Sequence, residues 1–171
     1  MAKPAKFVSA PRSVSPGVAA FRRTVILCVL AGWMFVIASL IGFAPADPPS
    51  HLVWPPNEPV SNWCGPIGAH IAYGLYKLLG LGVWVLMIIG AIGILSAAAG
   101  QRVSHWVVRA LGLAMLTVAA SGFQRIVLPE SGPFANLPGG LVGMTGSQRL
   151  IDSIGPVGAI LGLTLTAAVG A

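Results

Sequence analysis

Long uncharged apolar runs alternate along this chain with short stretches that hold most of its proline and charge. No charged residue falls between Arg23 and Asp47, between Lys77 and Arg102, between Arg109 and Arg125, or after Asp152. A helix needs about 20 apolar residues to cross the hydrocarbon core of a bilayer. The pattern therefore predicts an all-α membrane protein with four transmembrane helices, at about residues 24–44, 81–99, 105–123 and 154–171.

The first apolar run has a second interpretation, the core of a cleaved signal peptide. Arg22 and Arg23 form a twin-arginine pair before it, and Ala44-Pro45-Ala46 is a small-x-small cleavage site after it. Signal-peptide cores are about 7 to 15 residues long, whereas Thr24–Ala44 is uncharged for 21 residues. An uncleaved anchor is the favoured prediction, and a Tat-exported three-helix protein that begins at Asp47 is an alternative.

The second apolar stretch begins at Gly65 and is too long for one crossing. It divides naturally at Gly80-Leu81-Gly82. We predict a short helix at about 66–79, opened by Pro66 in its first turn, which lies at the outer membrane interface with Lys77 reaching water. Together with the four crossings, this interfacial helix makes up the predicted fold.

The remaining segments form a tail and two loops. Residues 1–20 mix Pro, Ser, Ala and Lys without a period, which predicts a disordered basic cytoplasmic tail ahead of a four-helix membrane domain at 21–171. The prolines of residues 45–65 exclude a helix and predict an outer loop. Residues 124–153 predict a second outer loop, from which Asp152 or Ser153 caps the last helix.

The positions of the charges predict the orientation. The chain has 10 Lys and Arg residues against 4 Asp and Glu residues, a net charge of +6. Five basic residues precede the first crossing and two, Arg102 and Arg109, follow the second, whereas all four acids fall in outer segments. Because cytoplasmic segments are rich in Lys and Arg, both termini are predicted to be cytoplasmic. Orientation accounts for the basic excess, so no direct nucleic-acid contact is expected.

Composition excludes a soluble enzyme, and no set of residues has the spacing of a reactive site. Hydrophobic residues make up 56% of the chain, with a mean hydropathy of +0.85, which leaves too few polar side chains to cover a soluble fold. No phosphate-binding motif occurs, since no lysine follows a glycine. The histidines fall on three separate segments, at His51, His70 and His105. We predict no catalytic, cofactor-binding or metal-binding residue, no cofactor, and no enzymatic activity in this chain.

A five-residue glycine motif occurs twice. Gly65-Pro66-Ile67-Gly68-Ala69 returns as Gly155-Pro156-Val157-Gly158-Ala159, each time after an outer loop and at the start of an apolar helix. Small residues allow close helix packing in membranes. Ordinary packing within the chain is the favoured interpretation, and a homo-oligomer interface is the alternative.

Several motifs stand in the order found in a known family. They are the tail ending in Phe21-Arg22-Arg23, then NWCGPIGAHIA at 62–72, LLG at 78–80, GGLVG at 139–143 and IGPVGA at 154–159. Over residues 20–171 the chain resembles the N-terminal four-helix membrane domain of the bacterial FtsK/SpoIIIE DNA translocases.

The resemblance implies an anchor in the bacterial inner membrane, at the division septum and among division proteins, with the lipid bilayer as its direct partner. In that family a hexameric ATP-driven motor follows the membrane domain and moves DNA during chromosome segregation. The motor's residues have no positions here, and the chain stops at Ala171 at the edge of the fourth helix. We therefore expect a truncated or split member. A small channel or transporter subunit is the alternative from another class.

Overall fold

The computed structural model describes residues 16–100 and 105–170, and these are arranged as helices joined by loops. The helices are α1 (Pro16–Ile41), α2 (Gly65–Leu79), α3 (Val83–Ala98), α4 (Trp106–Val127) and α5 (Gly140–Gly170), and the 3₁₀ turn η1 (Gly80–Gly82) joins α2 to α3. Among these described residues, four segments are long and apolar enough to cross a membrane: Ala20–Ile41, Gly65–Ala98, Trp106–Val127 and Gly140–Gly170. The all-α fold with four transmembrane helices is confirmed.

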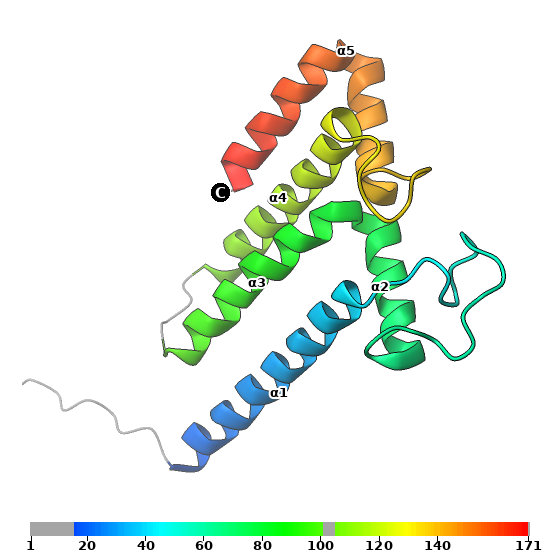
Figure 1. The fold of residues 1–171 in the computed structure, drawn as a ribbon. Coiled ribbons are helices and arrows are strands. Elements are labelled where there is room, and N and C mark those ends of the chain that lie inside the picture. The colour runs from blue at the N-terminus through cyan, green and yellow to red at the C-terminus, as the bar shows by residue number, and fades with distance from the viewer. Residues whose placement is uncertain (1–15, 101–104, 171) are drawn as a thin grey trace, which may run out of the picture.

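The chain is built from two units of similar architecture. The first unit consists of α1, α2, η1 and α3, and the second consists of α4 and the two halves of α5. In the view of Figure 1, the first helix of each unit (α1 or α4) rises obliquely, and the next helix (α2 or the first half of α5) stands nearly upright. The chain then bends, and the last helix (α3 or the second half of α5) runs back down. The loops at 42–64 and 128–139 lie at one end of the molecule, the loop end. The start of α1, the end of α3 and the start of α4 lie at the other, the tail end.

Glycines bend both units at the same spacing. Gly80 is fifteen positions after Gly65, and Gly155 is fifteen positions after Gly140. All four have positive φ, at 64°, 55°, 66° and 74°, a conformation that costs glycine little and other residues much. Gly155 therefore corresponds to Gly80, the bend of the first unit. The glycine motif at 155 precedes a helix as it does at 65, because the second half of α5 begins after the bend at Gly155. The prediction that an outer loop precedes the motif there is wrong, since the first half of α5 leads directly into it.

The predicted second outer loop at 124–153 is wrong at both ends. α4 continues to Val127 and α5 begins at Gly140, so the loop is 128–139. The glycines that suggested a loop instead form a small buried face with Ser147, and this face packs α5 closely on α4. Because the helix runs through them, Asp152 and Ser153 lie inside α5 and cap nothing.

The other boundaries differ less. α1 spans Pro16–Ile41 rather than 24–44, so residues 16–20 of the predicted disordered tail are helical, while residues 1–15 lie outside the described part. α1 stops early because Gly42 packs against the backbone of Trp63 and Pro45 follows soon after. The third crossing spans Trp106–Val127 rather than 105–123, and the second spans Val83–Ala98 rather than 81–99. The short helix predicted at 66–79 is observed as α2.

An aromatic cluster near the loop end joins the two loops to α2. Phe43 lies 5.3 Å from Tyr76 and 5.7 Å from Phe134, between ring centres, and Tyr73 lies 5.5 Å from Phe134. The Tyr76 hydroxyl donates to the Leu40 carbonyl at 3.3 Å. Since these rings come from both units, the cluster fixes the two units against each other.

Candidate functional site

Asp47 closes the first loop through its carboxylate. The residue is 2% exposed and accepts four hydrogen bonds from three residues farther along the loop. The Asn57 amide donates to Oδ1 at 2.7 Å, and the backbone N–H and hydroxyl of Ser61 both donate to Oδ1 at 3.0 Å. The backbone N–H of Asn62 donates to Oδ2 at 2.8 Å. A segment without regular secondary structure thus has a defined shape.

The same hydrogen bonds set the ionisation of Asp47. Burial by itself raises the pKa of a carboxyl group, but the donors from Ser61, Asn57 and Asn62 favour its charged form more strongly. The pKa of Asp47 is therefore lowered from its ordinary value of 3.8. The carboxylate is ionised at neutral pH.

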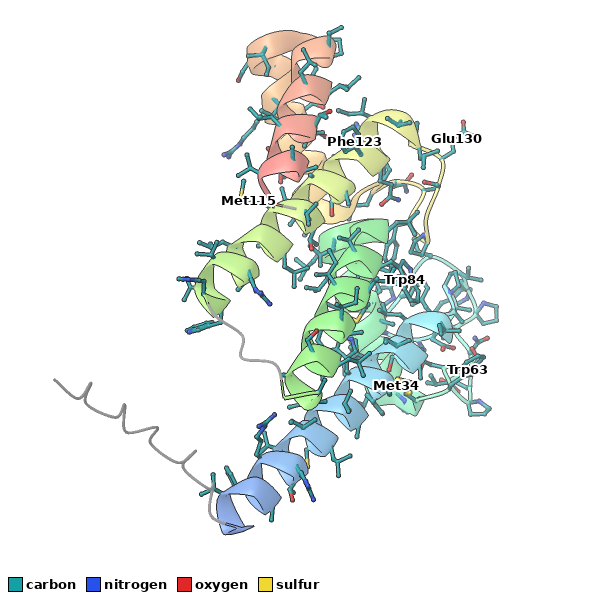
Figure 2. The ribbon with its side chains drawn as sticks, turned by 90° about the vertical axis from the view of Figure 1, so that its left-hand side faces the viewer. Met34, Trp63, Trp84, Met115, Phe123 and Glu130 are labelled. Atoms are coloured by element: carbon teal, nitrogen blue, oxygen red, sulfur yellow. The ribbon has the colours of Figure 1, made fainter. Side chains whose placement is uncertain are left out.

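Asn62 connects this loop to two helices. Its side-chain amide donates to the Ser39 carbonyl of α1 at 2.9 Å, and its Oδ1 accepts from the Cys64 N–H at 2.9 Å, just before α2. Trp54 and Trp63 are 86% and 73% exposed, and Trp63 lies on the loop side of the molecule in Figure 2. The loop therefore has a defined backbone and two exposed indole rings. Exposed Trp side chains are typical of the membrane–water interface.

Three glycines with positive φ meet where the two units touch. We call Gly80, Gly139 and Gly140 the glycine junction. A Cβ added at Gly80 would lie 2.7 Å from the Gly139 carbonyl carbon, and one added at Gly140 would lie 2.6 Å from the Gly80 nitrogen. Backbone thus packs directly on backbone, with no room for a side chain. At the glycine junction the start of α5 packs against the bend between α2 and α3.

α4 supplies hydrogen-bond partners to that bend. Gln124 accepts from the Leu81 N–H at 2.6 Å and donates to the Ser131 carbonyl at 2.7 Å, and the Ser121 hydroxyl donates to the Leu79 carbonyl at 2.8 Å. A break in a helix frees backbone groups that are costly to leave unpaired in a membrane. In the second unit the position equivalent to Leu81 is Pro156, which has no N–H to satisfy.

Replacing Gln124 by leucine is expected to lower the free energy of unfolding by about 2–3 kcal/mol, because the Leu81 N–H and the Ser131 carbonyl lose their partner in a buried place. The measurement is a denaturant titration of the purified protein in detergent micelles, followed by helical circular dichroism. Gln148→Leu is the control, since Gln148 is exposed and bonds only the Asp152 carboxylate, at 3.0 Å. Equal stability of the two variants would contradict the role given to Gln124.

The tail end carries arginines from α1 and α4. An Nη of Arg22 donates to the Ala97 carbonyl at 2.9 Å, at the last turn of α3, where a cation complements the negative end of the helix dipole. Arg109 lies in the first turn of α4 and is exposed. His105 precedes α4 with a φ of 55°. Arg102, the other basic residue predicted to follow the second crossing, lies outside the described residues.

The histidines considered in the sequence analysis lie on separate segments and do not form a common site. His51 is exposed in the first loop, and His70 is exposed on α2 with Nδ1 at 2.8 Å from the Pro66 carbonyl oxygen. Within residues 16–100 and 105–170, no three His, Cys, Asp or Glu side chains are placed to hold a metal ion. Among the residues that organise the loop end, Asp47 and Gln124 were not distinguished by the sequence patterns, and Asn62 appeared there only as the first residue of the motif at 62–72.

These features define a class, the multi-pass helical membrane domain, here made of two bent units. A family model described as the 4TM region of DNA translocase FtsK/SpoIIIE matches residues 19–171. The chain belongs to this family, as the motifs from Phe21 to Ala159 indicated. The comparisons with curated proteins and with solved structures gave no match.

Proposed function

We propose that this chain anchors a DNA translocase in the bacterial inner membrane and concentrates it at the division septum. The observation that carries the proposal is the match of nearly the whole chain to the membrane region of the FtsK/SpoIIIE family, together with four helices of membrane-crossing length. The match is to the membrane region and not to the motor. In this proposal a motor domain generates force and contacts DNA. This chain determines where in the cell the translocase is located.

The proposed orientation places the tail end in the cytoplasm. Arg22, Arg23 and Arg109 are at this end, and Asp47 and Glu58 are in the first loop at the other. Retention of basic residues on the cytoplasmic side supports this assignment. A cytoplasmic C-terminus would let the anchor connect to a motor that acts on chromosomal DNA.

The structure supports an anchor that resists being pulled. A motor working on DNA transmits an opposing force to its attachment, so the crossings must hold together as one body. The glycine junction and the aromatic cluster link the two units, and large apolar side chains such as Leu27, Met34 and Leu161 remain exposed for lipid. Removing such side chains from the bilayer costs about 25 cal/mol per Å² of apolar area.

The test is a fusion of the full chain to a green fluorescent protein that folds only in the cytoplasm, placed after Ala171 and expressed in dividing rod-shaped bacteria. We expect fluorescence, which requires a cytoplasmic C-terminus, and a membrane signal at mid-cell above the value given by two apposed membranes. Gly140→Ala, which disrupts the glycine junction, should lose the mid-cell signal, while Gly146→Ala should retain it. A dark fusion would contradict the orientation, and a uniform membrane signal would contradict septal localisation.

A further inference from the structure

A groove opens between α3 and α4 toward the tail end. Near the loop end the two helices are in close contact, because a Cβ at Gly82 would lie 2.9 Å from the Thr117 carbonyl oxygen. Toward the tail end they separate (Figure 2), and a Cβ at Gly93 would meet nothing within 4 Å. The space between them has a volume of about 770 Å³ and is lined from α3 by Ile89, Ile92 and Ser96, and from α4 by Arg109, Leu113 and Leu116.

The lining changes from polar to apolar along the groove. Ser96 is in the last turn of α3 and Arg109 is in the first turn of α4, so both lie at the tail end. Ile89 and Leu116 lie farther into the membrane-spanning part, about two turns from them along each helix. A phospholipid has the same polarity, with a charged headgroup at the surface and acyl chains toward the middle of the bilayer.

The tail end of the groove is positively charged, which favours binding of an anion. Arg109 lines the groove, and Arg22 lies across the end of α3, bonded to Ala97. The four acids of the sequence are elsewhere: Asp47 and Glu58 in the first loop, Glu130 in the second, and Asp152 in the first half of α5. Among the described residues, the guanidinium of Arg109 thus has no carboxylate side chain to neutralise it at the membrane surface.

We propose that this groove binds one anionic phospholipid from the leaflet at the tail end, which is the cytoplasmic leaflet in the orientation given above. The phosphate contacts Arg109, because a guanidinium is well suited to bind phosphate oxygens, and the acyl chains lie along Ile92 and Leu113. A helix from a second copy fits less well. It is about 10 Å across, so roughly two turns would fill the whole space, whereas acyl chains adapt to an irregular groove.

The test uses the purified full chain in detergent, with lipids added after delipidation and bound lipid counted by native mass spectrometry. We expect phosphatidylglycerol to bind about tenfold more tightly than phosphatidylcholine of the same chain length, the difference made by one strong charged contact. Arg109→Gln should remove most of this preference, and Arg109→Lys should keep a good part of it. The control is Arg125→Gln, which removes a positive charge from the opposite end of α4.

Filling the groove tests its walls separately from its charge. Gly93→Leu projects a side chain into the space and should lower binding of both lipids at least fivefold relative to wild type. Gly32→Leu is the matched control, because Gly32 is also a transmembrane glycine with nothing within 4 Å. All variants are first checked for an unchanged helical spectrum and elution volume. Equal effects of Arg109→Gln and Arg125→Gln, or of the two leucine variants, would overturn the proposal, as would equal binding of the two lipids.

Discussion

Replacing Gly140 by alanine is expected to lower the free energy of unfolding by about 3–5 kcal/mol, the sum of backbone strain and overpacking. Gly140 has a φ of 66°, which opposes any L side chain. Its added methyl would also lie 2.5 Å from the Leu78 carbonyl carbon and 2.6 Å from the Gly80 nitrogen. These are backbone atoms of the other unit, so relief requires the two units to move apart.

Two further alanine variants separate the causes. Gly65 has a φ of 64° with nothing near an added Cβ, and Gly146 has ordinary helical geometry with nothing near it. Gly65→Ala should cost about 1–2 kcal/mol, from strain alone, while Gly146→Ala should be neutral or stabilise the helix by up to about 1 kcal/mol. The three are compared by denaturant titration in one detergent. If Gly140→Ala is no worse than Gly65→Ala, the units do not meet at the glycine junction.

Replacing Asp47 by alanine is expected to cost roughly 3 kcal/mol or more, since hydrogen bonds to a charged group contribute about 1.5–3 kcal/mol each and its donors would lose a common acceptor. The loop should then become more mobile. The thiol of Cys64, whose backbone N–H donates a hydrogen bond to Asn62, should react faster with a soluble maleimide than it does with Asp47 in place. Cys28 is replaced by serine in every sample so that one thiol is measured. Glu58→Ala is the control, because Glu58 is an exposed acid in the same loop.

The effect of Asp47 should depend on pH in a particular direction. Its pKa is lowered in the folded protein from an ordinary value of 3.8, so the carboxylate contributes its full stability above that value. The contribution is lost as the pH falls through the lowered pKa. The difference in melting temperature between wild type and Asp47→Ala should therefore be constant from pH 7 to about pH 5, and shrink only below about pH 4. A difference that shrinks between pH 7 and pH 5 would show that another group is responsible.

Hydropathy was sufficient for the crossings and for α2, because the bilayer imposes a length of apolar sequence that few other constraints can produce. It failed at residues 140–153. There glycine serves close packing on α4, and composition alone cannot distinguish a glycine that permits a turn from one that permits contact. The contacts of Gly139 and Gly143 with Ser121, on the preceding helix α4, show that these glycines permit close packing.

The polar residues that organise the loop end were missed for a related reason. Asp47 was assigned to a loop, and the structure places it in one, but its importance comes from donors ten to fifteen residues later that a proline-rich loop brings back to it. Gln124 was placed outside the third crossing, although an amide directly following an apolar run was a signal available in the sequence. What such an amide bonds is decided by tertiary structure, here the bend at Gly80.

The two bends also differ in what they require during synthesis. The Leu81 N–H of the first unit has its acceptor in Gln124, 43 residues farther along the chain on α4, whereas the second unit carries Pro156 at the equivalent position and needs no such acceptor. We therefore expect the hydrogen bonding of the first bend to be completed only once α4 is inserted beside it. Completion of the domain is thus tied to the arrival of its third crossing, about forty residues after the bend is made.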